Sequence, residues 1–180
     1  MLTACGQAKR WQKIAKHPFR ISVNVSGHQL EQKDFASRII TILSITGLSP
    51  EHLELEITES VFLHNLPAIL HSINCLKEEG VRFALDDFGM GYSSIHHLSR
   101  LPLDCLKIDQ SFVRALDSAQ TRTVIKAMAN LAGELGMRTV VEGVQTENEE
   151  FTLWQLGLNQ GQGYKLSPPV SAENAIHFLL

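Results

Sequence analysis

The segment LELEIT, Leu53–Thr58, decides the predicted fold of the chain because its side chains alternate between two faces. Its leucine and isoleucine side chains share one face and its two glutamates share the other, which is typical of a strand with two different surroundings. Apolar residues recur at helical spacing on both sides of it, in Phe35–Thr46 before it and Pro67–Glu79 after it. Gly47 and Gly80 follow these helices, where a left-handed cap is expected. The region is therefore predicted to be helix–strand–helix.

The same alternation continues along the chain. A further helix is expected at Thr121–Leu135, and strands are expected at Arg20–Ser26, Leu53–Thr58, Val81–Phe88, Asp104–Asp109, Arg138–Val144 and Asn159–Tyr164. Strands alternating with helices predict an α/β fold with a parallel sheet covered by helices, which is either a doubly wound sheet or a (β/α)8 barrel. We favour the barrel. A barrel usually needs roughly 200 residues or more, so residues 1–180 are expected to be a single partial domain that lacks about two strands.

Composition excludes several classes of protein. The 180 residues are 44% hydrophobic and 19% charged, with a net charge of −3. There is no basic surplus to bind a nucleic-acid polymer and no run of 18 apolar residues to span a membrane. The cysteines are odd in number and scattered, so we expect neither disulfides nor a zinc motif, and a cytoplasmic setting. They are Cys5, Cys75 and Cys105.

Polar residues stand at the C-terminal end of every predicted strand. They are Asn24, Glu56, Asp86 with Asp87, Lys107, Glu142 and Gln162. A single such residue is typical of a helix cap or a turn, but in barrels this end of the strands carries the active site. Crowded carboxylates repel each other and need a compensating cation. Oxygen donors without grouped Cys or His indicate Mg²⁺ or Mn²⁺, with Lys107 as a fixed positive charge for a phosphate or a water.

The segment DDFGMGYSS, Asp86–Ser94, can be explained in two ways. It is either a loop that orders over a metal site or a plain strand–helix turn capped by Ser93 or Ser94. Of the eight histidines, His96 and His97 are adjacent, and neighbouring helical residues point apart, so we expect no joint metal binding there. Trp154 is expected to be a packing residue.

Six segments together resemble the EAL domain family of cyclic di-GMP phosphodiesterases, in order and spacing. They are SVNVS (22–26), LELEITES (53–60), ALDDFGMGYSS (84–94), LPLDCLKIDQSFV (101–113), VVEGVQTE (140–147) and QGY (162–164). The resemblance runs from about residue 4 to the C-terminus. It implies a modified (β/α)8 barrel that uses Mg²⁺ or Mn²⁺, two ions in the intact domain, to hydrolyse cyclic di-GMP to linear pGpG in bacterial signalling.

The resemblance also implies roles for single residues. Metal ligands would be Asn24, Glu56 and Asp86, with Asp87 holding a second ion or the attacking water. Lys107 would position water and phosphate, and Glu142 would be a metal-site carboxylate and general base. Gln162 would contact the substrate, and Glu59 would anchor the DDFG loop. Partners implied by the family are cyclic di-GMP, an upstream sensory or cyclase domain, and a second copy in a homodimer.

The sequence departs from the family pattern at three places. Only 23 residues precede Asn24, so the strand that carries the Glu-Ala-Leu motif and its nearby arginine is absent. Gln145 stands where a second glutamate is usual, and Met90 where a small residue or Thr is usual. The absent glutamate would be a metal ligand. The alternative to a phosphodiesterase is therefore a catalytically inactive EAL fragment that binds cyclic di-GMP or a protein partner.

Overall fold

The computed structural model describes residues 1–91 and 98–180 of the chain. Ser93, Ser94, His96 and His97 lie outside the described residues. The described chain divides into two compact units, one formed by residues 1–84 with 170–180 and the other by residues 85–169. Strand β3 (Arg82–Phe88) runs across the boundary, and the strands follow one another in the sheet in chain order, from β1 to β6.

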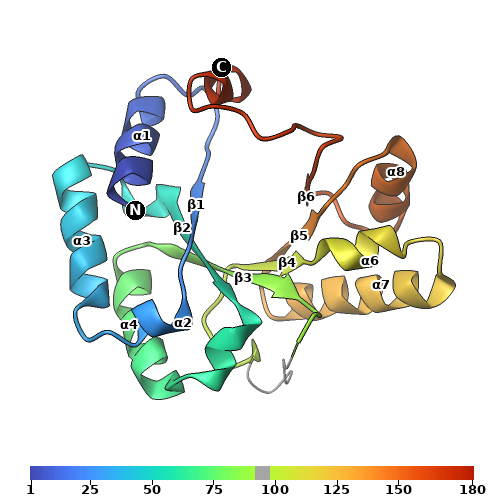
Figure 1. Cartoon of the computed structure of the whole chain (residues 1–180), viewed down its shortest axis with the longest axis horizontal. Helices are drawn as coiled ribbons and strands as arrows, with labels where there is room; N and C mark the ends of the chain where they lie inside the picture. The colour runs from blue at the N-terminus through green and yellow to red at the C-terminus, as the bar shows by residue number, and fades with distance from the viewer. Residues whose placement is uncertain (92–97) are drawn as a thin grey trace. The chain divides into compact units, whose positions relative to one another are not determined.

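The first unit is built on two strands paired in parallel, β1 (Ile21–Asn24) and β2 (Leu53–Thr58). Helices α1 (Leu2–Gln12), α3 (Phe35–Thr46) and α4 (Leu66–Glu78) accompany them (Figure 1). Short helical turns complete the unit: α2 (Gly27–Leu30), η1 (Pro50–His52), η2 (Glu59–Leu63) and η3 (Asn174–Phe178). The C-terminal segment returns to this unit, where Lys16 donates its backbone N–H to Leu179 O at 2.9 Å.

The second unit holds the parallel strands β4 (Cys105–Ile108), β5 (Arg138–Glu142) and β6 (Gly161–Gln162). Its helices are α6 (Gln110–Arg114), α7 (Ala119–Glu134) and α8 (Glu147–Gln155). Their apolar faces and the strands share one core, which includes Ile108, Val113, Ile125, Val141 and Leu153.

The α/β class is confirmed, and several bounds agree with the sequence prediction. The helix at Phe35–Thr46 and the strand at Leu53–Thr58 match residue for residue. Gly47 and Gly80 have the positive φ angles expected of caps, 65° and 99°. Five residues of β2 are buried in succession, as in a strand covered on both faces.

Three expectations need correction. The predicted strand Asp104–Asp109 ends at Ile108, because the Asp109 side chain accepts a hydrogen bond from the Ser111 backbone N–H at 2.8 Å and starts α6. The strand expected at Asn159–Tyr164 has two residues only. Trp154 is 67% exposed, so it is not a packing residue of the core.

No helix in the described part of the chain is long and apolar enough to cross a membrane.

Candidate metal centre

Strands β3, β4 and β5 present charged groups near their C-terminal ends, and the structure brings these groups together. The Lys107 ammonium lies 2.8 Å from Asp86 Oδ1 and 2.7 Å from Glu142 Oε1. The Lys107 side chain is 6% exposed, and the two carboxylates are 12% and 18% exposed. Because desolvation strengthens these interactions, the three side chains form a buried ionic cluster rather than a solvated surface pair.

Asp87 joins this cluster because its backbone departs from strand geometry. Its φ is 55°, the one positive φ at a non-glycine residue among the described residues. In a regular strand, neighbouring side chains point to opposite faces. The left-handed conformation breaks that alternation, so oxygen atoms of Asp86, Asp87 and Glu142 all lie within 4.8 Å of one another. Such conformations are tolerated by Asp but remain uncommon, and they gather at functional sites.

The electrostatics of the cluster fit a divalent cation. Three carboxylates face one ammonium, which leaves a formal charge of −2. Burial raises the pKa of Glu142, Lys107 opposes this shift, and the charges of Asp86 and Asp87 add to the rise. Asp86 Oδ1 is buried and accepts no hydrogen bond from the described residues, since its short contact with Lys107 is an ion pair without hydrogen-bond geometry. A buried, underused oxygen beside two more carboxylates suits a hard cation such as Mg²⁺ or Mn²⁺.

Two glycines allow the backbone to approach α6 closely beside the cluster. Gly143 follows Glu142 with φ 76°, and an added Cβ would lie 2.4 Å from Gln110 Cβ. Gly89 of the DDFG segment has φ 102°, and an added Cβ would lie 2.5 Å from the Phe112 ring. Both the conformation and the close contact exclude larger residues here. The ends of β3 and β5 are thereby held against the same short helix.

Gln162 is adjacent to this cluster in the sheet. It is the Cα partner of Glu142 in the parallel β5–β6 pair, and it is exposed. Met90, in the DDFG segment, is also exposed, and its sulfur accepts a hydrogen bond from Ser111 Oγ at 3.2 Å. The position that departs from the family pattern therefore contacts α6.

The remaining predicted site residues lie in the first unit. Asn24 and Glu56 are Cα partners at the C-terminal ends of β1 and β2. Asn24 is exposed and Glu56 is buried. Glu59 is buried as well and begins the turn that follows β2. Glu54 and Glu56, which share one face of β2, are both buried, at 3% and 8% exposure.

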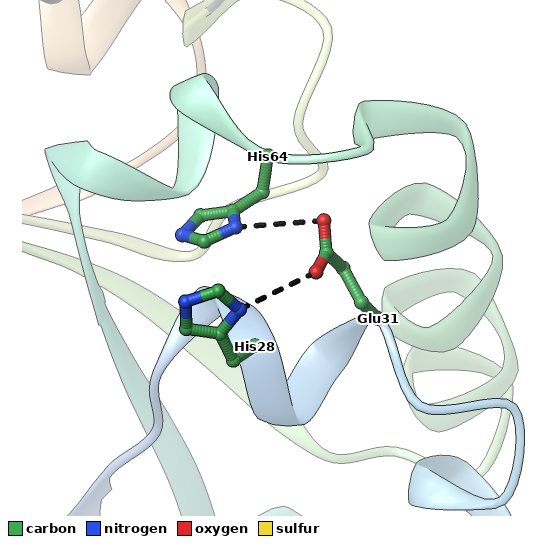
Figure 2. A group of neighbouring side chains, drawn as sticks. All are labelled: His28, Glu31 and His64. Carbon is green, nitrogen blue, oxygen red and sulfur yellow. Dashed lines mark ion pairs between the residues drawn. The ribbon is translucent and has the colours of Figure 1, made fainter.

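A second cluster of titratable side chains escaped the sequence analysis. His28, Glu31 and His64 come together in the first unit (Figure 2). The i,i+3 spacing of His28 and Glu31 is a weak signal by itself. His64 stands 33 residues beyond Glu31, and nothing local in the sequence connects it to the other two.

Comparisons with known proteins identify the family of this chain. The family model described as "EAL domain" matches residues 1–169. Over 171 residues the chain is 34% identical to the cyclic di-GMP phosphodiesterase PA2567 of Pseudomonas aeruginosa, covering 94% of this chain and 29% of that protein. The chain spans between 20% and 29% of the length of the curated relatives it matches.

Solved structures show the same fold. The PaMucR phosphodiesterase in complex with cyclic di-GMP superposes with a TM-score of 0.90 at 35% identity, over 96% of this chain and 70% of that one. Klebsiella pneumoniae BlrP1, in a complex with manganese and cyclic di-GMP, superposes with a TM-score of 0.82 at 26% identity, over 91% and 42% of the two chains. The matched sequence, the fold and the carboxylates at the strand ends lead to one conclusion: this chain belongs to the EAL domain family.

Proposed function

We propose that this domain is a metal-dependent phosphodiesterase that hydrolyses cyclic di-GMP to linear pGpG. The observation that carries the proposal is the group of Asp86, Asp87 and Glu142 around Lys107. It combines the two features that hydrolysis of a phosphodiester needs: oxygen donors for a divalent cation and a fixed positive charge for the phosphate. Family membership supports the choice of substrate.

The metal ligands would be the three carboxylates of the second unit. The resemblance to the family assigns the role of metal ligand to Asn24 and Glu56 of the first unit as well. Mg²⁺ or Mn²⁺ would polarise the phosphate and lower the pKa of a bound water. Asp86 is the most buried of the three carboxylates, which favours it as a ligand. Two ions would be held in the intact domain.

Glu142 would act as the general base, and Lys107 would position Glu142, the phosphate and the water. A carboxylate whose pKa is raised by burial accepts a proton more readily near neutral pH. Glu142 would therefore take the proton from the attacking water. The resulting hydroxide adds to phosphorus, and the bond from phosphorus to one ribose oxygen breaks. That oxygen takes a proton from solvent, to which Glu142 returns its own. Lys107 would hold Glu142 in place and orient the phosphate and water through its ammonium.

Two residues would act on the substrate and on the loop. The exposed Gln162 would contact the nucleotide beside Glu142, its partner in the sheet. Glu59 would anchor the DDFG segment. An upstream sensory or cyclase domain and a homodimer belong to the same proposal, since the curated relatives are several times longer than this chain.

The test is a hydrolysis assay on the 180-residue chain with Mn²⁺ or Mg²⁺, paired with the same chain preceded by the Glu-Ala-Leu strand of a relative. We expect linear pGpG from the extended form and none in the presence of EDTA. Heat of binding on adding cyclic di-GMP, with no product from either form, would contradict the proposal and favour the binding module. Analytical ultracentrifugation of the same samples tests the dimer.

A further inference from the structure

His28, Glu31 and His64 form a compact cluster that plays no part in the proposed hydrolysis. His28 lies in α2, Glu31 caps the end of α2, and His64 follows η2. Figure 2 shows both imidazole rings turning a nitrogen toward the same carboxylate. His28 Nδ1 lies 3.6 Å from Glu31 Oε2, and His64 Nδ1 lies 3.5 Å from Glu31 Oε1.

These distances indicate the kind of interaction. They exceed the usual 2.7–3.2 Å of an N–H···O hydrogen bond. They are close to the separation of about 3.3 Å expected for two ligands of a tetrahedral metal with bonds near 2.0–2.1 Å. One possible ligand atom from each residue lies within 4.8 Å of the others. These separations therefore suit a shared ion and are longer than those of ordinary hydrogen bonds.

An ion pair without a metal explains the cluster less well. The two rings are 4.4 Å apart between centroids and tilted by 76°. If both imidazoles carried a proton and a charge, they would repel each other at this distance. Two neutral imidazoles can face one carboxylate without repulsion when a cation lies between them.

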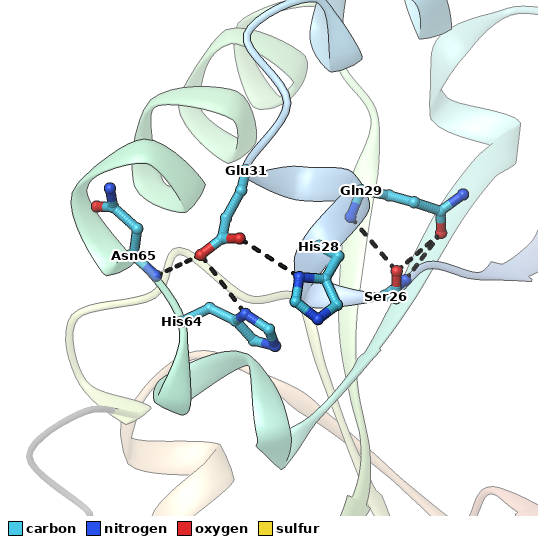
Figure 3. A network of polar contacts seen from close by, with 6 residues as sticks. All are labelled: Ser26, His28, Gln29, Glu31, His64 and Asn65. Atoms are coloured by element: carbon cyan, nitrogen blue, oxygen red, sulfur yellow. Dashed lines mark hydrogen bonds and ion pairs between the residues drawn. The ribbon is translucent and has the colours of Figure 1, made fainter.

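The surrounding contacts hold the carboxylate and one ring in place (Figure 3). The Asn65 backbone N–H donates to Glu31 Oε1 at 2.6 Å, so the segment that carries His64 also fixes Glu31. That hydrogen bond and the nearby histidines lower the pKa of Glu31, against a smaller effect of burial. Ser26 and Gln29 form a capping box that fixes the start of α2.

The His64 ring packs against Gly27. A Cβ added to Gly27 would lie 2.4 Å from His64 Cδ2, so the ring packs directly on the backbone of α2. The His64 side chain is 20% exposed and that of His28 is 82% exposed. The His64 ring is thus held in place before any ion binds. The His28 ring lies on the solvent side and can move by the few tenths of an ångström that coordination requires.

We propose that His28, Glu31 and His64 are a second metal site, for Zn²⁺ or a similar borderline divalent ion. Two imidazole nitrogens and one carboxylate oxygen suit Zn²⁺, whereas Mg²⁺ prefers oxygen donors alone. Three protein ligands leave the fourth position of a tetrahedron for water. The bound ion ties the segment after β1 to the segment after β2, the two strands that carry Asn24 and Glu56.

The test measures Zn²⁺ binding to the full chain by competition with a chromophoric chelator, with excess Mg²⁺ present to occupy the carboxylate centre. We expect His28→Gln, Glu31→Gln and His64→Gln each to weaken Zn²⁺ binding by about tenfold or more. Gly27→Ala removes no ligand but displaces the His64 ring, so it should weaken binding as well. Melting in EDTA shows whether each variant is folded, and Zn²⁺ should raise the melting temperature of the wild type more than that of these four variants.

His71→Gln is the matched control. It removes an exposed imidazole of the same unit that lies 3.8 Å from Cys75 Sγ, the competing pair of zinc donors. X-ray absorption of the zinc-loaded protein should show imidazole scattering that His28→Gln with His64→Gln abolishes. Sulfur scattering, loss of binding in His71→Gln, or unchanged binding in all three cluster variants would overturn the proposal. None of these readouts depends on hydrolysis of cyclic di-GMP.

Discussion

Lys107 Nζ lies 2.7 Å from Glu142 Oε1, and both side chains are largely buried. The same ammonium also serves Asp86, at 2.8 Å. The Lys107 ammonium therefore compensates two carboxylates on the two strands that flank its own strand in the sheet. Replacing Lys107 should therefore affect the stability of the fold and the hydrolysis reaction in different ways.

Lys107→Met should destabilise the metal-free protein, because it leaves buried carboxylates without a counter-charge. Breaking a buried pair of this kind costs roughly 3–5 kcal/mol in the free energy of unfolding. Saturating Mn²⁺ should restore part of the loss. Urea denaturation with EDTA and with Mn²⁺ measures both effects. Lys165→Met is the control: its contacts with Glu147 and Glu150 are 3.6 Å long and exposed, so the change should stay below about 1 kcal/mol.

Asp86→Asn should abolish hydrolysis by weakening metal binding, with a loss of about 100-fold or more in turnover. The assay is product formation by the form that carries the Glu-Ala-Leu strand, at several Mn²⁺ concentrations. Asp109→Asn is a suitable comparison because Asp109 caps α6, and Asn is an equally good cap. Wild-type rates in Asp86→Asn would show that the metal assignment is wrong.

Glu142 should make the metal-free protein less stable as the pH rises. Burial holds its pKa above the usual value, so the folded state keeps the proton longer than the unfolded chain does. Stability then falls as the pH rises from the unfolded pKa, about 4.3, through the folded one. Glu142→Gln should remove this decline in urea titrations with EDTA. An unchanged pH slope in the variant would contradict the assignment.

Glu31 should make the protein less stable as the pH falls, which is the opposite of the effect of Glu142. The hydrogen bond from the Asn65 N–H lowers its pKa, so its contribution is present above the unfolded pKa and is lost as the pH falls through the folded pKa. Glu31→Gln keeps an oxygen acceptor for Asn65 and should flatten the acid side of the stability curve. Urea denaturation of the wild type and of Glu31→Gln at acidic pH measures the difference.

Gly143→Ala should destabilise the fold and disturb Glu142, the residue before it. The cost of the left-handed φ is about 1–3 kcal/mol, and the contact with Gln110 adds to it. Gly133→Ala provides the contrast. Gly133 lies inside α7 with nothing within 4 Å of an added Cβ, so alanine there should stabilise by about 0.5–1 kcal/mol. Equal melting temperatures for the two variants would contradict the prediction.

The sequence predicted the regular elements well where a pattern and a terminator coincide. The apolar spacing of Phe35–Thr46 ends at Gly47, and the alternation of Leu53–Thr58 is unbroken, so their bounds were predicted to the residue. Asp109 was assigned to a strand because it follows Lys107 and Ile108 in alternation. Its role as a helix cap depends on a hydrogen bond to Ser111, which the pattern does not encode.

Part of the candidate site could also be predicted from the sequence, because several of its residues stand at the ends of predicted strands. Asp86, Lys107 and Glu142 follow strands, so their gathering at one end was expected from topology, and their contacts confirm it in the second unit. Alternation would have turned Asp87 away, and only its positive φ brings its carboxylate to the others. The cluster of His28, Glu31 and His64 depends on tertiary contacts between segments after two different strands, and it has no local signature.

The return of residues 170–180 to the first unit makes that unit discontinuous in the chain. The backbone bond from Lys16 to Leu179 joins two segments that are far apart in the chain. The second unit is continuous, whereas the first unit is complete only when residues 170–180 have been synthesised after it. Deleting residues 170–180 should therefore impair the unit whose other residues are translated before the second unit.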